Sequence, residues 1–129
     1  MTTTSRWRAR CADDGEFQLT SRYWTGALQF DLGPETVTLE LRDGLLVDPP
    51  DPSADDGIQS MRGAVVIQAP DDVWDRILAE IPPPQYNDII AAQKFGLRIR
   101  GDSETFWQYY PAIRRAVEIL RDVRLEAAV

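Results

Sequence analysis

The chain has 129 residues, of which 43% are hydrophobic and 27% are charged, and it carries a formal net charge of −7, one cysteine and no histidine. This length and composition predict one globular domain and exclude a disordered or fibrous protein. The negative charge disfavours nucleic acid as a partner, and the absence of histidine excludes Ser-His-Asp catalysis, Cys-His catalysis and histidine-based zinc sites. We expect a protein without catalytic residues, bound metal or cofactor.

The first thirteen residues are expected to form an N-terminal arm. From Arg6 to Cys11, charged and less polar residues alternate, which fits either a short edge strand or a loosely held basic arm, and we favour the arm.

The polar start lacks the apolar core of a signal peptide, and no apolar run reaches the length of a membrane span. A single cysteine agrees with a reducing compartment, so we expect a cytoplasmic protein without stable membrane insertion.

The next segment is expected to be helical. Phe17, Tyr23 and Trp24 follow helical spacing, and Asp13 or Asp14 is the candidate N-cap. The alternative is a strand, because Phe17 and Tyr23 also fit an alternating pattern.

Alternating apolar residues predict antiparallel strands in the middle of the chain. Residues 28–32 and 37–41 alternate in this way on the two sides of a Gly-Pro turn. Asp43-Gly44 is a hairpin signal, because both positions tolerate positive φ. Residues 48–57 are rich in aspartate and proline and predict a loop, after which residues 65–67 predict a central strand.

The clearest helix starts at Pro70, which suits a first helical position and precedes two aspartates that favour the positive end of the helix dipole. Its buried face is expected to contain four residues with helical spacing: Trp74, Ile77, Leu78 and Ile81. Three consecutive prolines end this helix, and Asn87 or Asp88 is the candidate cap of a short helix that carries Ile89.

The last third of the chain predicts a strand and then helical structure. Glycines bound residues 96–101, where two inward apolar residues alternate with two outward arginines. Large apolar residues then recur at helical steps, and Pro111 predicts a kink or a break near Tyr109 and Tyr110. The expected organisation is an N-terminal arm (1–13), one domain (14–124) and a C-terminal tail (125–129).

In this order, the predicted elements resemble those of the sterol carrier protein type 2 family. The match is best over residues 62–120, where residues 63–67 resemble the family's strand and residues 69–74 its helix entry. Residues 95–102, Phe-Gly-Leu-Arg-Ile-Arg-Gly-Asp, are similar to the family's glycine-bounded signature. The chain departs from the pattern at its proline run and at the aromatic segment 106–111.

The resemblance implies an α+β fold in which helices cover a twisted antiparallel sheet of about five strands. It also implies a tunnel between sheet and helices that takes sterols, fatty acyl chains or similar molecules. The residues that would line such a tunnel are Trp74, Ile77, Leu78, Ile81, Ile89, Phe106, Trp107, Tyr110, Ile113 and Val117. An apolar helical stripe is packed core in most proteins, so core packing remains the alternative interpretation of these residues.

Two functions are compatible with these sequence features. The first is a non-catalytic binding protein for a hydrophobic small molecule. The alternative is an interaction module that docks on a partner enzyme or forms a homodimer, with the tunnel filled by side chains. The four aromatic residues within positions 106–110 bear on both, because they cannot all face one side of a helix and at least one must point to a groove, a partner or solvent.

Overall fold

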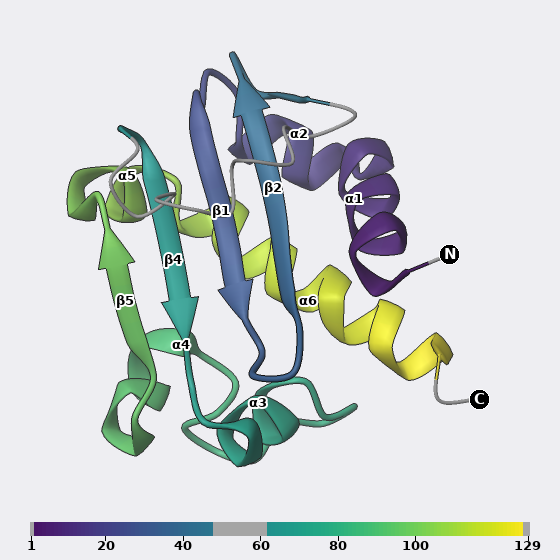
Figure 1. Cartoon of the computed structure of the whole chain (residues 1–129), viewed down its shortest axis with the longest axis vertical. Helices are drawn as coiled ribbons and strands as arrows, with labels where there is room; N and C mark the ends of the chain where they lie inside the picture. The colour runs from purple at the N-terminus through teal and green to yellow at the C-terminus, as the bar shows by residue number, and fades with distance from the viewer. Residues whose placement is uncertain (1, 48–61, 128–129) are drawn as a thin grey trace.

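The computed structural model describes residues 2–47 and 62–127. Within this part of the chain, five strands form one sheet, and helices cover one of its faces and its ends (Figure 1). The strands are β1 (Gly26–Asp31), β2 (Thr36–Arg42), β3 (Leu45–Leu46), β4 (Ala64–Gln68) and β5 (Arg98–Gly101). The expected α+β fold is confirmed, whereas the loop expected at residues 48–57 lies outside the described residues.

The strand order is β3-β2-β1-β4-β5. Neighbouring strands are antiparallel except β1 and β4, which run parallel with Leu28 opposite Val65. The sheet is therefore mixed and not wholly antiparallel, because local alternation reveals strands but not the direction in which β4 joins β1. The predicted hairpin is confirmed, with φ of 51° at Asp43 and 80° at Gly44.

The N-terminal segment is a helix and not a loosely held arm. Helix α1 (Thr3–Asp13) is capped by the hydroxyl of Thr2, and Trp7 and Cys11 on its inner face are fully buried. The Trp7 indole N–H donates a hydrogen bond of 2.9 Å to the carbonyl oxygen of Ala116. The physical reason is the i, i+4 spacing of the two buried residues, which the alternating arginines between them obscured.

The expected helix is confirmed for the next segment, which forms α2 (Gly15–Thr20). The Asp14 carboxylate accepts a hydrogen bond of 2.8 Å from the backbone N–H of Phe17, so Asp14 is the N-cap. The helix is shorter than the aromatic spacing indicated, because Tyr23 and Trp24 lie beyond its end and Tyr23 has a φ of 75°.

Helix α3 (Asp71–Ile77) also ends earlier than predicted, with Pro70 as its N-cap residue. The buried face does not extend to Ile81, whose side chain is 84% exposed. The reason is that a residue before a proline disfavours helical conformation, and Ile81 precedes the first of three prolines. Two short helices follow: α4 (Ile89–Ala92), capped by Asp88, and η3 (Gln93–Phe95).

The predicted break near Pro111 is confirmed. Asp102 caps α5 (Ser103–Gln108), and Tyr109 separates this helix from α6 (Tyr110–Ala127). Helix α6 continues through the described part of the expected tail, and Val123 near its end is fully buried. The C-terminal segment is therefore helical as far as Ala127, and the apolar stripe of α6 is buried as far as Val123.

The main core lies between the sheet and helices α1, α2 and α6, and Figure 1 shows α6 crossing behind the strands with α1 beside β2. Phe30 contacts two indole rings there, with centroid distances of 5.2 Å to Trp7 and 5.7 Å to Trp74. A salt bridge of 2.8 Å between Asp14 and Arg115 joins the α2 cap to α6. Through Trp74, helix α3 also contributes to this core.

Candidate functional site

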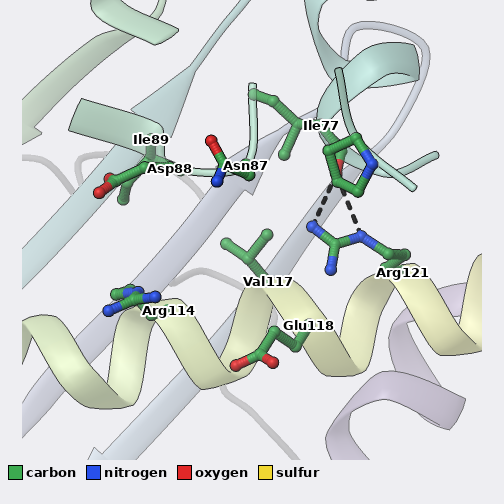
Figure 2. Close-up of a pocket in the computed structure, with 9 residues that line it drawn as sticks. Ile77, Asn87, Asp88, Ile89, Arg114, Val117, Glu118 and Arg121 are labelled. Atoms are coloured by element: carbon green, nitrogen blue, oxygen red, sulfur yellow. Dashed lines mark hydrogen bonds between the residues drawn. The ribbon is translucent and has the colours of Figure 1, made fainter. Parts of the chain in front are cut away.

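A cleft with a volume of about 220 Å³ lies between the end of α3, the segment that leads into α4, and α6 (Figure 2). Its lining residues are Ile77, Pro82, Asn87, Asp88, Ile89, Arg114, Val117, Glu118 and Arg121. The lining combines apolar side chains with charges of both signs, so the cleft is amphipathic.

Three apolar residues from three elements form the inner wall. Ile77 is the last residue of α3, Ile89 is the first residue of α4, and Val117 lies in α6. Their exposed fractions are 1%, 3% and 5%. Figure 2 shows the Val117 side chain pointing from α6 toward Ile77. An apolar group that enters the cleft would therefore meet packed side chains on several sides.

Arg121 fixes one end of the cleft. Its guanidinium donates two hydrogen bonds to the carbonyl oxygen of Ile77, of 3.2 Å from Nε and 2.9 Å from Nη2 (Figure 2). A cationic donor at the C-terminal end of α3 satisfies a carbonyl that the short helix leaves without an intrahelical partner. Arg121 thus holds α3 to α6 and keeps Ile77 in place.

Asp88 fixes the opposite side. Its carboxylate accepts a hydrogen bond of 2.9 Å from the backbone N–H of Ile90, which caps α4, and a short hydrogen bond from the Tyr110 hydroxyl. Burial and the hydrogen bond to Asp88 both raise the pKa of Tyr110, so its hydroxyl stays protonated and continues to donate near neutral pH. This bond ties α4 to the first turn of α6.

Arg114 is the cation best placed to meet a ligand. It forms no ion pair within the described residues, and its guanidinium lies 5.8 Å from the centroid of the Tyr110 ring. Arg115, the next residue, is instead bound by Asp14 through hydrogen bonds of 3.0 and 2.8 Å. The two arginines point to different partners because consecutive helical residues lie on different faces.

The ten residues predicted to bind a ligand do not all meet in one place. Three of them, Ile77, Ile89 and Val117, line the cleft. Among the other seven, Trp74, Leu78 and Ile113 are buried in the core, Phe106 and Trp107 border a groove beside β5, Tyr110 lies between the cleft and this groove, and Ile81 is exposed. Residues expected to wall one tunnel thus line two separate cavities.

The polar half of the cleft was not predicted from the sequence. Asp88 was expected only as a cap, and none of Asn87, Glu118 and Arg121 was expected to bind a ligand. One signal was available, because positions 114, 117, 118 and 121 share one face of a helix at steps of three and four. The expectation that an aromatic residue of the 106–110 cluster points outward is confirmed, since Trp107 is 62% exposed.

Two observations on the described residues bear on metal binding and on thiol chemistry. None of them form a group of three or more His, Cys, Asp or Glu side chains that could hold a metal ion. Cys11 is fully buried, and burial together with the nearby Asp14 carboxylate raises the pKa of its thiol, which disfavours a nucleophilic thiolate. None of the helices in residues 2–47 and 62–127 combines the length and hydropathy needed to span a bilayer.

No protein-family model and no curated protein matches this sequence. Its fold, in contrast, is similar to two solved structures. The crystal structure of sterol carrier protein 2 aligns with a TM-score of 0.64 and 16% identity, over 92% of this chain and 93% of that protein. The solution structure of a conserved hypothetical protein from Thermus thermophilus aligns with a TM-score of 0.59 and 18% identity, over 94% of this chain and 85% of that protein. The chain therefore has the fold of sterol carrier protein 2, as the resemblance in its sequence predicted.

Proposed function

We propose that this protein is a non-catalytic binding protein for a hydrophobic small molecule, such as a fatty acyl chain, a sterol or a related lipid. The observation that carries the proposal is the amphipathic cleft, in which Ile77, Ile89 and Val117 supply an apolar wall beneath a charged rim. Sites for small molecules commonly combine such a wall with a few polar groups that orient the ligand. The shared fold with sterol carrier protein 2 agrees with this function.

The size of the cleft bears on the kind of ligand. Its volume of about 220 Å³ is below the roughly 300–1,000 Å³ of pockets that enclose drug-sized ligands. A slim acyl chain therefore fits the cleft better than a sterol nucleus, which would require its walls to part. The segment between α3 and α4, which carries Pro82 and Asn87, contains no helix or strand and is the wall that we expect to move.

Thermal denaturation with a panel of long-chain fatty acids, acyl thioesters and sterols tests the proposal. A ligand that binds only the folded state raises the melting temperature in a concentration-dependent way. Ile77→Trp should remove this response by filling the cleft, and Val117→Phe is a smaller alternative if the first variant folds poorly. Leu19→Trp is the matched control, because it adds the same indole to an exposed position on α2.

Loss of the response in Ile77→Trp or Val117→Phe, with retention in Leu19→Trp, would support the cleft as the binding site. If no member of the panel shifts the melting temperature of the parent protein, the lipid-binding proposal is wrong. Equal shifts in the parent and in both cleft variants would show that binding takes place elsewhere.

A further inference from the structure

The outer edge of β5 is free in the part of the chain that the structure describes. β5 is the last strand of the sheet and pairs only with β4, through Ile67 opposite Ile99 and Val65 opposite Gly101. Its residues are exposed or partly exposed. A free strand edge presents unpaired backbone N–H and C=O groups, which an extended segment of another chain can pair with.

An apolar groove runs beside this edge. It has a volume of about 190 Å³, and its apolar lining comes from Ile90, Ile99, Phe106 and Trp107. Trp107 is 62% exposed, whereas the other three tryptophans of the chain are at most 1% exposed. A large exposed indole next to a pocket is typical of an anchor residue for a protein partner.

The two charged side chains of β5 itself are cationic, whereas the whole chain is acidic and Asp102, which follows β5, caps α5. Lys94, Arg98 and Arg100 are exposed and form no ion pair within residues 2–47 and 62–127, although the chain has a formal net charge of −7. Two copies paired edge to edge would bring these cations together, which disfavours a homodimer at this site. The same cations favour an acidic partner.

We propose that the β5 edge binds an extended acidic segment of a partner protein, which adds a sixth strand to the sheet. Successive side chains of a strand point to opposite faces, so the side chains of Arg98 and Arg100 lie on one face and that of Ile99 lies on the other, toward the groove, which Arg100 also borders. A matching segment therefore alternates acidic and apolar residues. Its carboxylates meet the two arginines, and an apolar side chain enters the groove against Trp107. This function is separate from lipid binding in the cleft.

Trp107 provides the readout, because acrylamide quenches exposed tryptophans and the other three are buried. The probe is the blocked peptide Glu-Ile-Glu-Val-Glu-Ile, compared with its uncharged counterpart Gln-Ile-Gln-Val-Gln-Ile. We expect the acidic peptide to protect Trp107 from quenching and to slow amide exchange at residues 98–101. Added salt should weaken binding, because the charge contacts lie at the surface.

The double variant Arg98→Glu/Arg100→Glu should bind the acidic peptide at least about tenfold more weakly and should prefer a Lys-Ile-Lys-Val-Lys-Ile peptide. Arg42→Glu is the matched control, since it reverses an exposed arginine on β2, away from β5, and should leave binding unchanged. Absence of protection at Trp107 and at residues 98–101 would overturn the proposal, as would equal binding of the acidic and uncharged peptides. Binding of vesicles with anionic lipids through Trp107 and the two arginines, with no peptide bound, would instead make this face a membrane contact.

Discussion

The four tryptophans lie in two regions of the molecule that differ in the burial and the hydrogen bonding of their indole rings. In the sealed region around β1, the indole N–H groups of Trp7, Trp24 and Trp74 donate to backbone carbonyl oxygens at 2.9, 2.9 and 2.7 Å. In the open region at β5, Trp107 is largely exposed and lies beside two rings, Phe106 at a centroid distance of 5.0 Å and Tyr110 at 6.1 Å. The first arrangement stabilises the fold, and the second leaves an apolar surface for a partner.

The two neighbouring arginines of α6 also differ in role between the sealed region and the open region. Arg115 serves the sealed region, where Asp14 binds it with two hydrogen bonds, and Arg114 stands at the cleft without an ion pair among the described residues. Side chains of one type, close in sequence, thus serve packing in one region and remain available for binding in the other. Each of the following predictions tests this division.

The largest contrast is expected between two tryptophan truncations. Trp7→Ala should lower the free energy of unfolding by about 3–5 kcal/mol, because it opens a cavity and removes the buried hydrogen bond from the indole to the Ala116 carbonyl oxygen. Trp107→Ala should change it by less than about 0.5 kcal/mol, as exposed substitutions usually do. Urea denaturation of both variants measures the difference. Similar losses in the two would contradict the assignment of Trp107 to a binding surface.

Substitution of Gly101, which lies between the two regions, should lower the stability of the fold almost as much. Gly101 has a φ of 99°, and a Cβ there would clash with the backbone carbonyl of Ala64 on β4. Gly101→Val should therefore cost about 3 kcal/mol, measured by thermal or urea denaturation. Gly15→Ala is the control, since nothing lies within 4 Å of the added Cβ and the position is helical. A Gly101→Val protein as stable as the parent would show that β4 and β5 separate easily.

The Asp14–Arg115 pair predicts a pH dependence. The hydrogen bond from Arg115 holds the pKa of Asp14 below its ordinary value, so the pair stabilises the fold fully above the unfolded pKa of about 4. That contribution is lost as the pH falls through the lower folded pKa. Asp14→Asn keeps a capping side chain but removes the charge, and it should cost about 1 kcal/mol at neutral pH.

The Arg10–Glu126 pair is the control for this effect, because both side chains are about half exposed. Glu126→Gln should change stability by less than about 0.5 kcal/mol. Urea denaturation between pH 3 and pH 7 compares the two variants. If the pH dependence of Asp14→Asn matches that of the parent protein, the pair does not stabilise the native state.

A modest effect is expected at the cleft. Tyr110→Phe removes the hydroxyl that binds Asp88 and should cost about 0.5–1.5 kcal/mol. Because Asp88 still caps α4, the helix should remain formed, but the amide protons of Ile90 and Ala92 should exchange faster as α4 loosens from α6. Unchanged exchange in α4 would show that other contacts hold this wall of the cleft.

Local patterns in the sequence predicted much of the fold, and the errors have local physical reasons. The hairpin at Asp43-Gly44 and the break at Pro111 were predictable, because backbone chemistry determines both. Helix α1 does not stand out in the sequence because arginines separate its two buried residues. Helix α3 ends at Ile77, before the proline run, although its apolar spacing continues to Ile81.

The candidate site was less predictable. Ile77 and Val117 are 40 positions apart, and the tertiary packing of α3 against α6, which includes the Arg121 hydrogen bonds to the Ile77 carbonyl oxygen, brings them together. The helix break at Tyr109 then directs Trp107 to a different cavity from Val117. Hydrophobic periodicity shows only which residues share a face within one helix or strand. It cannot show which residues of different elements come into contact, or in which direction a side chain points after a helix break.

The central claim is that an apolar ligand enters the cleft between α3, α4 and α6. Its most direct test is a titration of methyl-labelled protein with palmitate, followed by the NMR signals of isoleucine and valine methyl groups. The account predicts concentration-dependent shifts at Ile77, Ile89 and Val117, with Ile67 in β4 unchanged. Shifts that centre on Ile99 beside Trp107, or no shifts at all, would contradict it.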